Sequence, residues 1–205
     1  MREMKTAILA TLCFFVLTAV IYPALLLGIG LLVPEQANGS LVDVQGNLTT
    51  DPSQAVGSRL VGQPFTQEQY FWGRPSVVNY SAGDLNSDPN NLLKTGISGG
   101  SNLAPSNPSL LEQVEEHIQT LQAAGLQTIP ADLVYSSGSG LDPHVSPAGI
   151  QAQLVRVAEA RAITPDQIRP LIEQATEHRF LGLFGDPGVN VLRLNIALDQ
   201  QFPRS

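Results

Sequence analysis

The amino-acid sequence predicts an α+β protein in which one N-terminal transmembrane helix precedes a single extracytoplasmic soluble domain. Three observations predict this class. A long apolar run occupies residues 6–33, short turn-bounded runs typical of strands follow it, and capped amphipathic helices occupy the second half of the chain. We therefore expect a few strands and then helices within a domain that covers residues 34–205.

The apolar run is long enough to cross a bilayer. Residues 6–33 carry no charged side chain, and about 20 apolar residues suffice for a spanning helix. Pro23 lies within the run and is expected to bend the helix, because proline has no backbone N–H and crowds the preceding turn. A cleaved secretory signal is the alternative, but its apolar core would be only about 7–15 residues long.

Charges beside the run predict its orientation. Arg2 and Lys5 precede it and Glu35 follows it. By the positive-inside rule, residues 1–5 are cytoplasmic and the main domain lies outside the cell (inner) membrane.

Strand candidates in the first half are residues 40–45, 58–65 and 70–74, each bounded by turn residues. The polar stretch 79–107 contains few apolar residues and is expected to form a long loop. Loops of this length in a compact domain are usually functional or contact a partner.

Cap residues predict three helices in the second half. The first begins after Asn107 and ends before Gly125, and the second begins after Ser146. The third begins after Thr164, with Gln167 as the partner in a capping box.

The segment 188–199 is ambiguous. Its apolar residues alternate from 192 to 198, as in a strand, but they also fit a helix capped by Asn190, which we favour.

Composition excludes several classes of protein. Beyond residue 33, the chain carries nine Lys or Arg and seventeen Asp or Glu. This acidity argues against binding to nucleic acid or electrostatic adhesion to anionic lipid, because those partners are also negative. Cys13 is the single cysteine and lies in the apolar run, so the outer domain has neither a disulfide framework nor a thiolate metal site.

Catalytic motifs are incomplete. Ser139, Asp142 and His144 are the residue types of a serine hydrolase, but they do not form a G-x-S-x-G elbow, and one short loop could hardly bring all three together. The glycine-rich stretches lack the lysine that a P-loop requires. The three histidines are scattered at intervals unlike those of a compact metal site. We expect neither a catalytic set nor a bound metal.

Aromatic residues gather between Phe65 and Tyr80. We expect Phe71 to lie in the core, whereas Trp72 and Arg74 fit either the core or an interface, because Trp and Arg dominate binding hot spots.

Five ordered motifs, together with the N-terminal span, cover nearly the whole chain. They are GSRLVGQPF (57–65), YFWGRPS (70–76), SGGSNLAPSNP (98–108), DLVYSSGSGLDPHVSPAGIQAQLVRVAEAR (132–161) and GVNVLRLNIALD (188–199). In this combination the chain resembles the KdpC family, which supplies one subunit of the Kdp potassium-transporting P-type ATPase complex.

The resemblance implies an accessory, non-catalytic subunit that supports assembly of the complex. Its partners would be the potassium-conducting, the ATP-hydrolysing and the very small subunits of the Kdp complex. Members of the family have been suggested to act as catalytic chaperones that raise the ATP affinity of the ATP-hydrolysing subunit. Gln153 matches the suggested nucleotide contact, and the chain would have no cofactor of its own apart from ATP shared with that partner.

We place Gln153 on the external side of the membrane, where ATP is scarce, and this placement argues against direct contact with ATP. A membrane-anchored serine hydrolase and a stand-alone extracytoplasmic binding module remain the alternatives. Six residues are candidates for contacts with partner subunits: Trp72, Arg74, Ser98, Asn102, Asp142 and Arg156.

Overall fold

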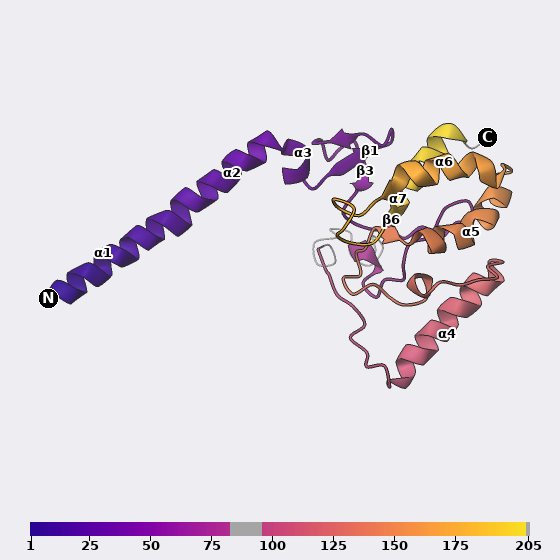
Figure 1. Cartoon of the computed structure of the whole chain (residues 1–205), viewed down its shortest axis with the longest axis horizontal. Helices are drawn as coiled ribbons and strands as arrows, with labels where there is room; N and C mark the ends of the chain where they lie inside the picture. The colour runs from indigo at the N-terminus through magenta and orange to yellow at the C-terminus, as the bar shows by residue number, and fades with distance from the viewer. Residues whose placement is uncertain (83–95, 204–205) are drawn as a thin grey trace.

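A computed structural model describes residues 1–82 and 96–203 of the chain. A long N-terminal helix projects from a mixed helix and sheet domain, which contains the C-terminal end of the described chain (Figure 1). The predicted α+β class is confirmed, with strands early in the domain and helices later. The predicted loop at 79–107 lies partly outside the described residues.

The N-terminal helix runs without interruption from Arg2 to Leu32 and is apolar and long enough to cross a membrane. It comprises α1 (Arg2–Val16), a π-helical turn (Leu17–Ile21) and α2 (Tyr22–Leu32). A bend was expected at Pro23, which lies at the start of α2, but Figure 1 shows the helix continuing from α1 into α2 without a sharp bend. The wider π turn ends at Ile21, two residues before Pro23, and local π adjustments can re-satisfy the backbone groups that a proline frees in a membrane helix.

A short linker joins this helix to the first sheet. It contains α3 (Pro34–Ala37), and the sheet contains β1 (Leu41–Asp43), β2 (Leu48–Thr49) and β3 (Ala55–Ser58) in the antiparallel order β2-β1-β3. The strand predicted at 40–45 is confirmed by β1. The strand predicted at 58–65 is wrong beyond its first residue, because β3 ends at Ser58 and turns follow it.

Helices in the second half build the core. The three predicted helices are α4 (Pro108–Ala123), α5 (Pro147–Ala160) and α6 (Pro165–Ala175), and α7 (Val191–Gln201) follows them. Their caps form as expected. Asn107 and Ser146 accept backbone N–H bonds at the starts of α4 and α5, and Thr164 forms a capping box.

The core lies mainly among α5, α6 and α7, whose buried side chains include Ile150, Leu154, Ile168, Leu194 and Leu198. Helix α4 stands at the edge of the domain (Figure 1), and Leu121 is its one buried residue.

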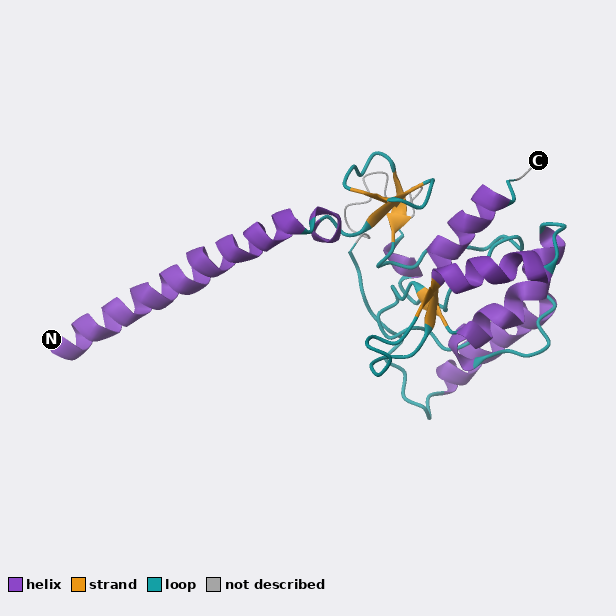
Figure 2. Ribbon diagram, turned by 45° about the horizontal axis from the view of Figure 1, so that its top comes forward, coloured by secondary structure: helices purple, strands orange, loops and turns teal. Residues whose placement is uncertain are grey.

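A second sheet, which sequence reasoning missed, lies within the helical half (Figure 2). Its strands are β4 (His144–Val145), β5 (Thr176–Glu177) and β6 (Gly188–Asn190), in the antiparallel order β4-β6-β5. The ambiguous segment 188–199 is therefore a strand for three residues and then a helix. Asn190 caps α7 as predicted, accepting the Arg193 N–H at 3.1 Å.

Candidate functional site

Residues 68–70 lie in a turn, closed by the Tyr70 N–H donating to the Gln67 carbonyl at 3.1 Å, and residues 71–76 have no regular secondary structure, so the strand predicted at 70–74 is wrong. Side chains from α5 and α7 take the place of a neighbouring strand. The amide of Asn195 accepts the Phe71 N–H and donates to the Phe71 carbonyl, both at 3.0 Å. The amide of Gln153 likewise accepts the Trp72 N–H at 2.8 Å and donates to the Trp72 carbonyl at 3.2 Å. A primary amide carries one acceptor and two donors, so it can pair with a backbone unit as a strand does.

Two arginines complete this arrangement, which we call the side-chain clasp (Gln153, Arg156, Arg161 and Asn195). Arg156 donates to the carbonyls of Glu68 and Tyr70, and its guanidinium lies 3.9 Å from the centre of the Trp72 ring. Arg161 donates to the Gln69 carbonyl at 2.7 Å. The clasp therefore fixes the aromatic segment by its backbone and stacks a cation on its tryptophan.

Gln153 lies at the centre of the clasp. Its side chain is 0 % exposed, its oxygen also accepts a 2.8 Å bond from Arg156, and its nitrogen also donates to the Gly149 carbonyl. Burial lowers the pKa of Arg156 to about 10, although the charge of Glu68 acts to raise it. Arg156 therefore stays charged at neutral pH. The Gln153 amide thus has both of its polar atoms engaged within the domain.

The serine-rich loop 137–142 is also held by backbone contacts. Ser137 N–H donates to the Pro75 carbonyl at 3.0 Å, and Gly99 N–H donates to the Ser139 carbonyl at 2.8 Å. Gly140 has a φ of +66°, and a Cβ there would come within 2.7 Å of the Gly99 carbonyl oxygen. The loop therefore needs glycine at this position to pack against its neighbours.

An ion-pair network joins this loop to the second sheet. Arg74 Nη1 lies 2.9 Å from Asp142 Oδ2, and His144 lies between Asp142 and Glu177, with Nε2 at 3.1 Å from the Glu177 carboxylate. Burial acts to raise the pKa of Asp142, but hydrogen bonds from His144 and Arg74 outweigh it and lower the pKa to about 2. The bond to Asp142 raises the pKa of His144 against the effect of burial, and Glu177 adds to the rise.

These contacts do not assemble a hydrolase. The Ser139 hydroxyl accepts the Leu141 N–H at 3.1 Å, and both ring nitrogens of His144 face carboxylates. Asp142 is engaged with Arg74 instead of orienting a base toward Ser139. Within the described residues, no group of three or more His, Cys, Asp or Glu side chains is placed to hold a metal ion.

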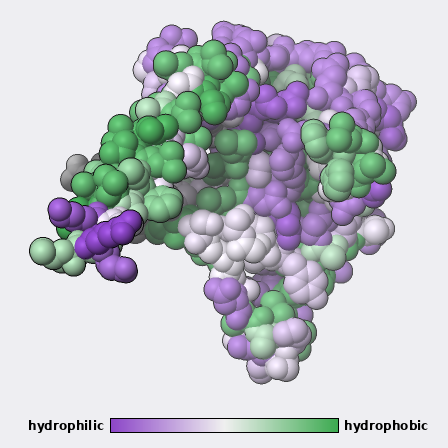
Figure 3. Space-filling view, turned by 60° about the vertical axis from the view of Figure 1, so that its left-hand side comes forward, coloured by the Kyte–Doolittle hydropathy of each residue, from purple (hydrophilic) through white to green (hydrophobic). Residues whose placement is uncertain are grey.

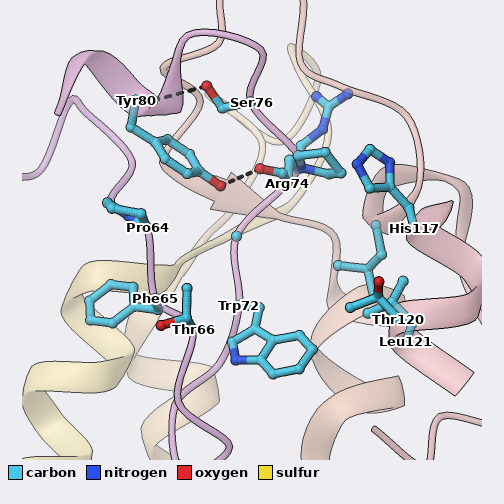
Figure 4. Close-up of a pocket in the computed structure, with 13 residues that line it drawn as sticks. Pro64, Phe65, Thr66, Trp72, Arg74, Ser76, Tyr80, His117, Thr120 and Leu121 are labelled. Atoms are coloured by element: carbon cyan, nitrogen blue, oxygen red, sulfur yellow. Dashed lines mark hydrogen bonds between the residues drawn. The ribbon is translucent and has the colours of Figure 1, made fainter. Parts of the chain in front are cut away.

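A pocket near the clasp has a volume of about 320 Å³ and lies between the segment 64–76 and α4. Figure 4 shows Trp72 and Phe65 on one side, Tyr80 above, and His117 with Leu121 from α4 on the other side. Burial raises the pKa of Tyr80 to about 12. The charge of Asp142 also raises this pKa and the charge of Arg74 lowers it, so the phenol stays neutral. Its hydroxyl donates to the Arg74 carbonyl.

The pocket is poorly suited to phosphate. His117 Nδ1 is bonded to the Val134 carbonyl at 2.7 Å. Arg74 is the one cationic residue among the described lining residues, and it already pairs with Asp142. Phosphate sites usually combine cations with converging backbone N–H groups.

The six candidate contact residues have different environments. Ser98 and Asn102 are exposed, Trp72, Arg74 and Asp142 are half-buried, and Arg156 is buried. The structure brings Trp72 together with Arg156 and Arg74 together with Asp142. Sequence reasoning missed Asn195 and Arg161, because nothing local in the sequence shows that their side chains bond to a segment more than ninety residues away.

The fold and the site define a class of protein: an α+β domain carried on one apolar N-terminal helix, in which the buried amides of Gln153, Asn190 and Asn195 are bonded within the domain. Comparison with known proteins gives the family. The model of the family described as "K+-transporting ATPase, c chain" matches residues 4–200. The chain belongs to this family, KdpC.

Curated relatives match over nearly their full length. The chain is 54 % identical over 201 residues to the potassium-transporting ATPase KdpC subunit of Synechocystis sp., covering 98 % of this chain and 99 % of the relative. It is 51 % identical to KdpC subunit 1 of Nostoc sp., covering 98 % of each chain. It is 45 % identical to the KdpC subunit of Geobacter sulfurreducens, covering 99 % of this chain and all of the relative.

Proposed function

We propose that this chain is a single-pass accessory subunit of a K⁺-transporting ATPase and contributes no catalytic group of its own. The match of residues 4–200 to the KdpC family carries the proposal, because it includes both the apolar helix and the outer domain. The engagement of Ser139, Asp142 and His144 in separate contacts supports the non-catalytic role.

The proposed topology follows from the helix and its flanking charges. Residues 6–33, which lie mostly within the helix Arg2–Leu32, cross the membrane, residues 1–5 are cytoplasmic, and residues 34–205 form the outer domain. In this position the domain supports assembly with the potassium-conducting, ATP-hydrolysing and very small subunits. It also covers the outer mouth of the potassium-conducting partner, where its acidity raises the local concentration of potassium.

The suggested contact of Gln153 with ATP stays a prediction. In the folded domain, a ligand would reach this amide only if segment 68–72 moved away, since Trp72 occupies both of its polar atoms. We propose instead that Gln153 holds the aromatic segment in place. Any effect of this residue on the ATP affinity of the ATP-hydrolysing partner would then act through the shape of the domain.

The orientation can be tested with single cysteines in a Cys13→Ser background. Val155 on α5 is 56 % exposed and Met4 is 61 % exposed, so Val155→Cys and Met4→Cys form a matched pair on opposite sides of the membrane. We expect a membrane-impermeant maleimide to label Val155→Cys in intact cells and Met4→Cys only after permeabilisation. The reverse pattern would refute the proposed topology and make direct ATP contact at Gln153 credible.

A further inference from the structure

The hairpin between β5 and β6 carries an apolar tip, residues 180–184, that projects large side chains into solvent. The exposed fractions are 70 % for Phe180, 74 % for Leu181, 76 % for Leu183 and 64 % for Phe184. The tip contains no charged residue. Contiguous exposed apolar side chains on a folded domain usually mark a contact with a membrane or a protein. Figure 3 shows hydrophobic patches on the domain surrounded by hydrophilic surface.

The tip is a folded turn whose backbone is largely satisfied internally. Phe180 and Phe184 exchange two backbone bonds, at 2.9 and 3.0 Å, and the N–H groups of Gly182 and Leu183 donate to carbonyls within the turn. An unpaired backbone group is costly to move out of water. Because four of the five N–H groups in residues 180–184 are paired within the turn, entry of the tip into an apolar environment leaves few backbone donors unpaired.

Charged residues form a collar at the base of the tip. Arg179 and Asp186 pair at 3.1 Å, and both side chains are exposed. A charged collar below an uncharged apolar tip matches the depth profile of a bilayer surface, where apolar side chains reach the acyl boundary and charges stay among the headgroups.

The position of the hairpin favours a lipid surface over a distant partner. In Figure 1, the hairpin that leads into β6 lies on the side of the domain toward the N-terminal helix. The domain cannot move far from the bilayer, since only eight residues lie between Leu32 and Leu41, a reach of at most about 30 Å. Ser40 is itself fixed by a 3.0 Å bond from the Arg59 N–H. The short tether therefore keeps the tip at a high effective concentration near lipid.

We propose that the apolar tip inserts into the outer interface of the bilayer that the N-terminal helix crosses. The inference rests on the proposed anchoring of the chain. It gives the outer domain a second membrane contact, which restrains how the domain tilts and rotates about its tether.

The test uses the full chain with Cys13→Ser, reconstituted in phosphatidylcholine vesicles. An environment-sensitive fluorophore is attached at Leu183→Cys in the tip or at Val155→Cys, the exposed control on α5. Acyl-chain spin-labelled lipid is then added as the quencher. We expect the label at 183 to be quenched several-fold more strongly than the label at 155. Adding Leu181→Ser and Phe184→Ser should abolish the difference.

Equal quenching at the two positions in a chain that resists alkaline carbonate extraction would overturn tip insertion and leave the anchor intact. Release of the chain by carbonate would overturn the anchor and the tip contact together. In the assembled pump, a label at 183 that is shielded from aqueous iodide but not quenched by the spin-labelled lipid would show that the tip docks on a protein partner. That result would also overturn the proposal.

Discussion

Replacing Gln153 with alanine tests whether this residue holds the domain together. The substitution removes an amide that is 0 % exposed and bonded to Trp72, Gly149 and Arg156. It leaves the Trp72 N–H and carbonyl and one Arg156 donor without their partner. Each lost partner of a buried polar group costs about 1–3 kcal/mol, and partial access of water lowers this at Trp72. Allowing for the small cavity as well, we expect a loss of about 3 kcal/mol in the free energy of unfolding.

The single tryptophan of the chain provides the assay, because Trp72 lies directly against the clasp. Urea unfolding of the detergent-solubilised full chain is followed by Trp72 fluorescence. With a urea dependence of about 2 kcal/mol per molar, the unfolding midpoint should fall by about 1.5 M. Gln151→Ala is the matched control. Gln151 lies on the same helix, is exposed, and makes one 3.3 Å contact, with Arg169, so its loss should change the free energy of unfolding by less than about 0.5 kcal/mol.

An unchanged midpoint for Gln153→Ala, combined with weaker ATP binding in the assembled pump, would refute the structural account. The amide would then act as a ligand contact, as suggested for the family.

Three further predictions concern the serine-rich loop and its ion pairs. Gly140→Ala should destabilise the domain by at least about 2 kcal/mol in the same assay, because of its positive φ and close neighbours. Gly138→Ala, whose added Cβ has no atom within 4 Å, should leave the free energy of unfolding nearly unchanged. Equal losses of stability in the two variants would contradict the argument that Gly140 is needed for packing. The low pKa of Asp142 contributes stability that is present above about pH 4 and is lost as the pH falls toward 2. The raised pKa of His144 contributes stability that is present below about pH 6.5 and is lost as the pH rises through the pKa of His144 in the folded chain. At about pH 5, His144→Gln should therefore have a lower free energy of unfolding than the unsubstituted chain. In alkaline solution the two free energies should converge, as measured by urea unfolding at each pH. Serine-reactive fluorophosphonate should fail to label the chain, and labelling that disappears in Ser139→Ala would revive the hydrolase alternative.

Local signals in the sequence predicted what local physics determines. The apolar run predicted the long helix, and the caps at Asn107, Ser146, Thr164 and Asn190 predicted where α4, α5, α6 and α7 begin. Each cap depends on side-chain and backbone atoms only two or three residues apart, so the sequence alone contains the relevant geometry.

The remaining features depend on contacts between distant segments. The segment 70–74 has the aromatic composition of a strand, but its backbone partners are the amides of Gln153 and Asn195 on helices α5 and α7. The second sheet was missed because β4 and β5 have only two residues each, too few for a period-2 pattern. The serine-rich loop was expected to be non-catalytic, which stays a prediction, and its pairing with Arg74 and Glu177 emerges only from the fold.

Purification through a C-terminal tag on this chain, from membranes of cells grown at low potassium, tests the central claim most directly. The measured quantity is potassium-stimulated ATP hydrolysis in the purified material. We predict that this activity co-purifies with the chain and is lost when the helix Arg2–Leu32 is replaced by a cleavable secretory signal. Recovery of the chain from detergent as a lone monomer without ATPase activity would contradict its assignment to the pump.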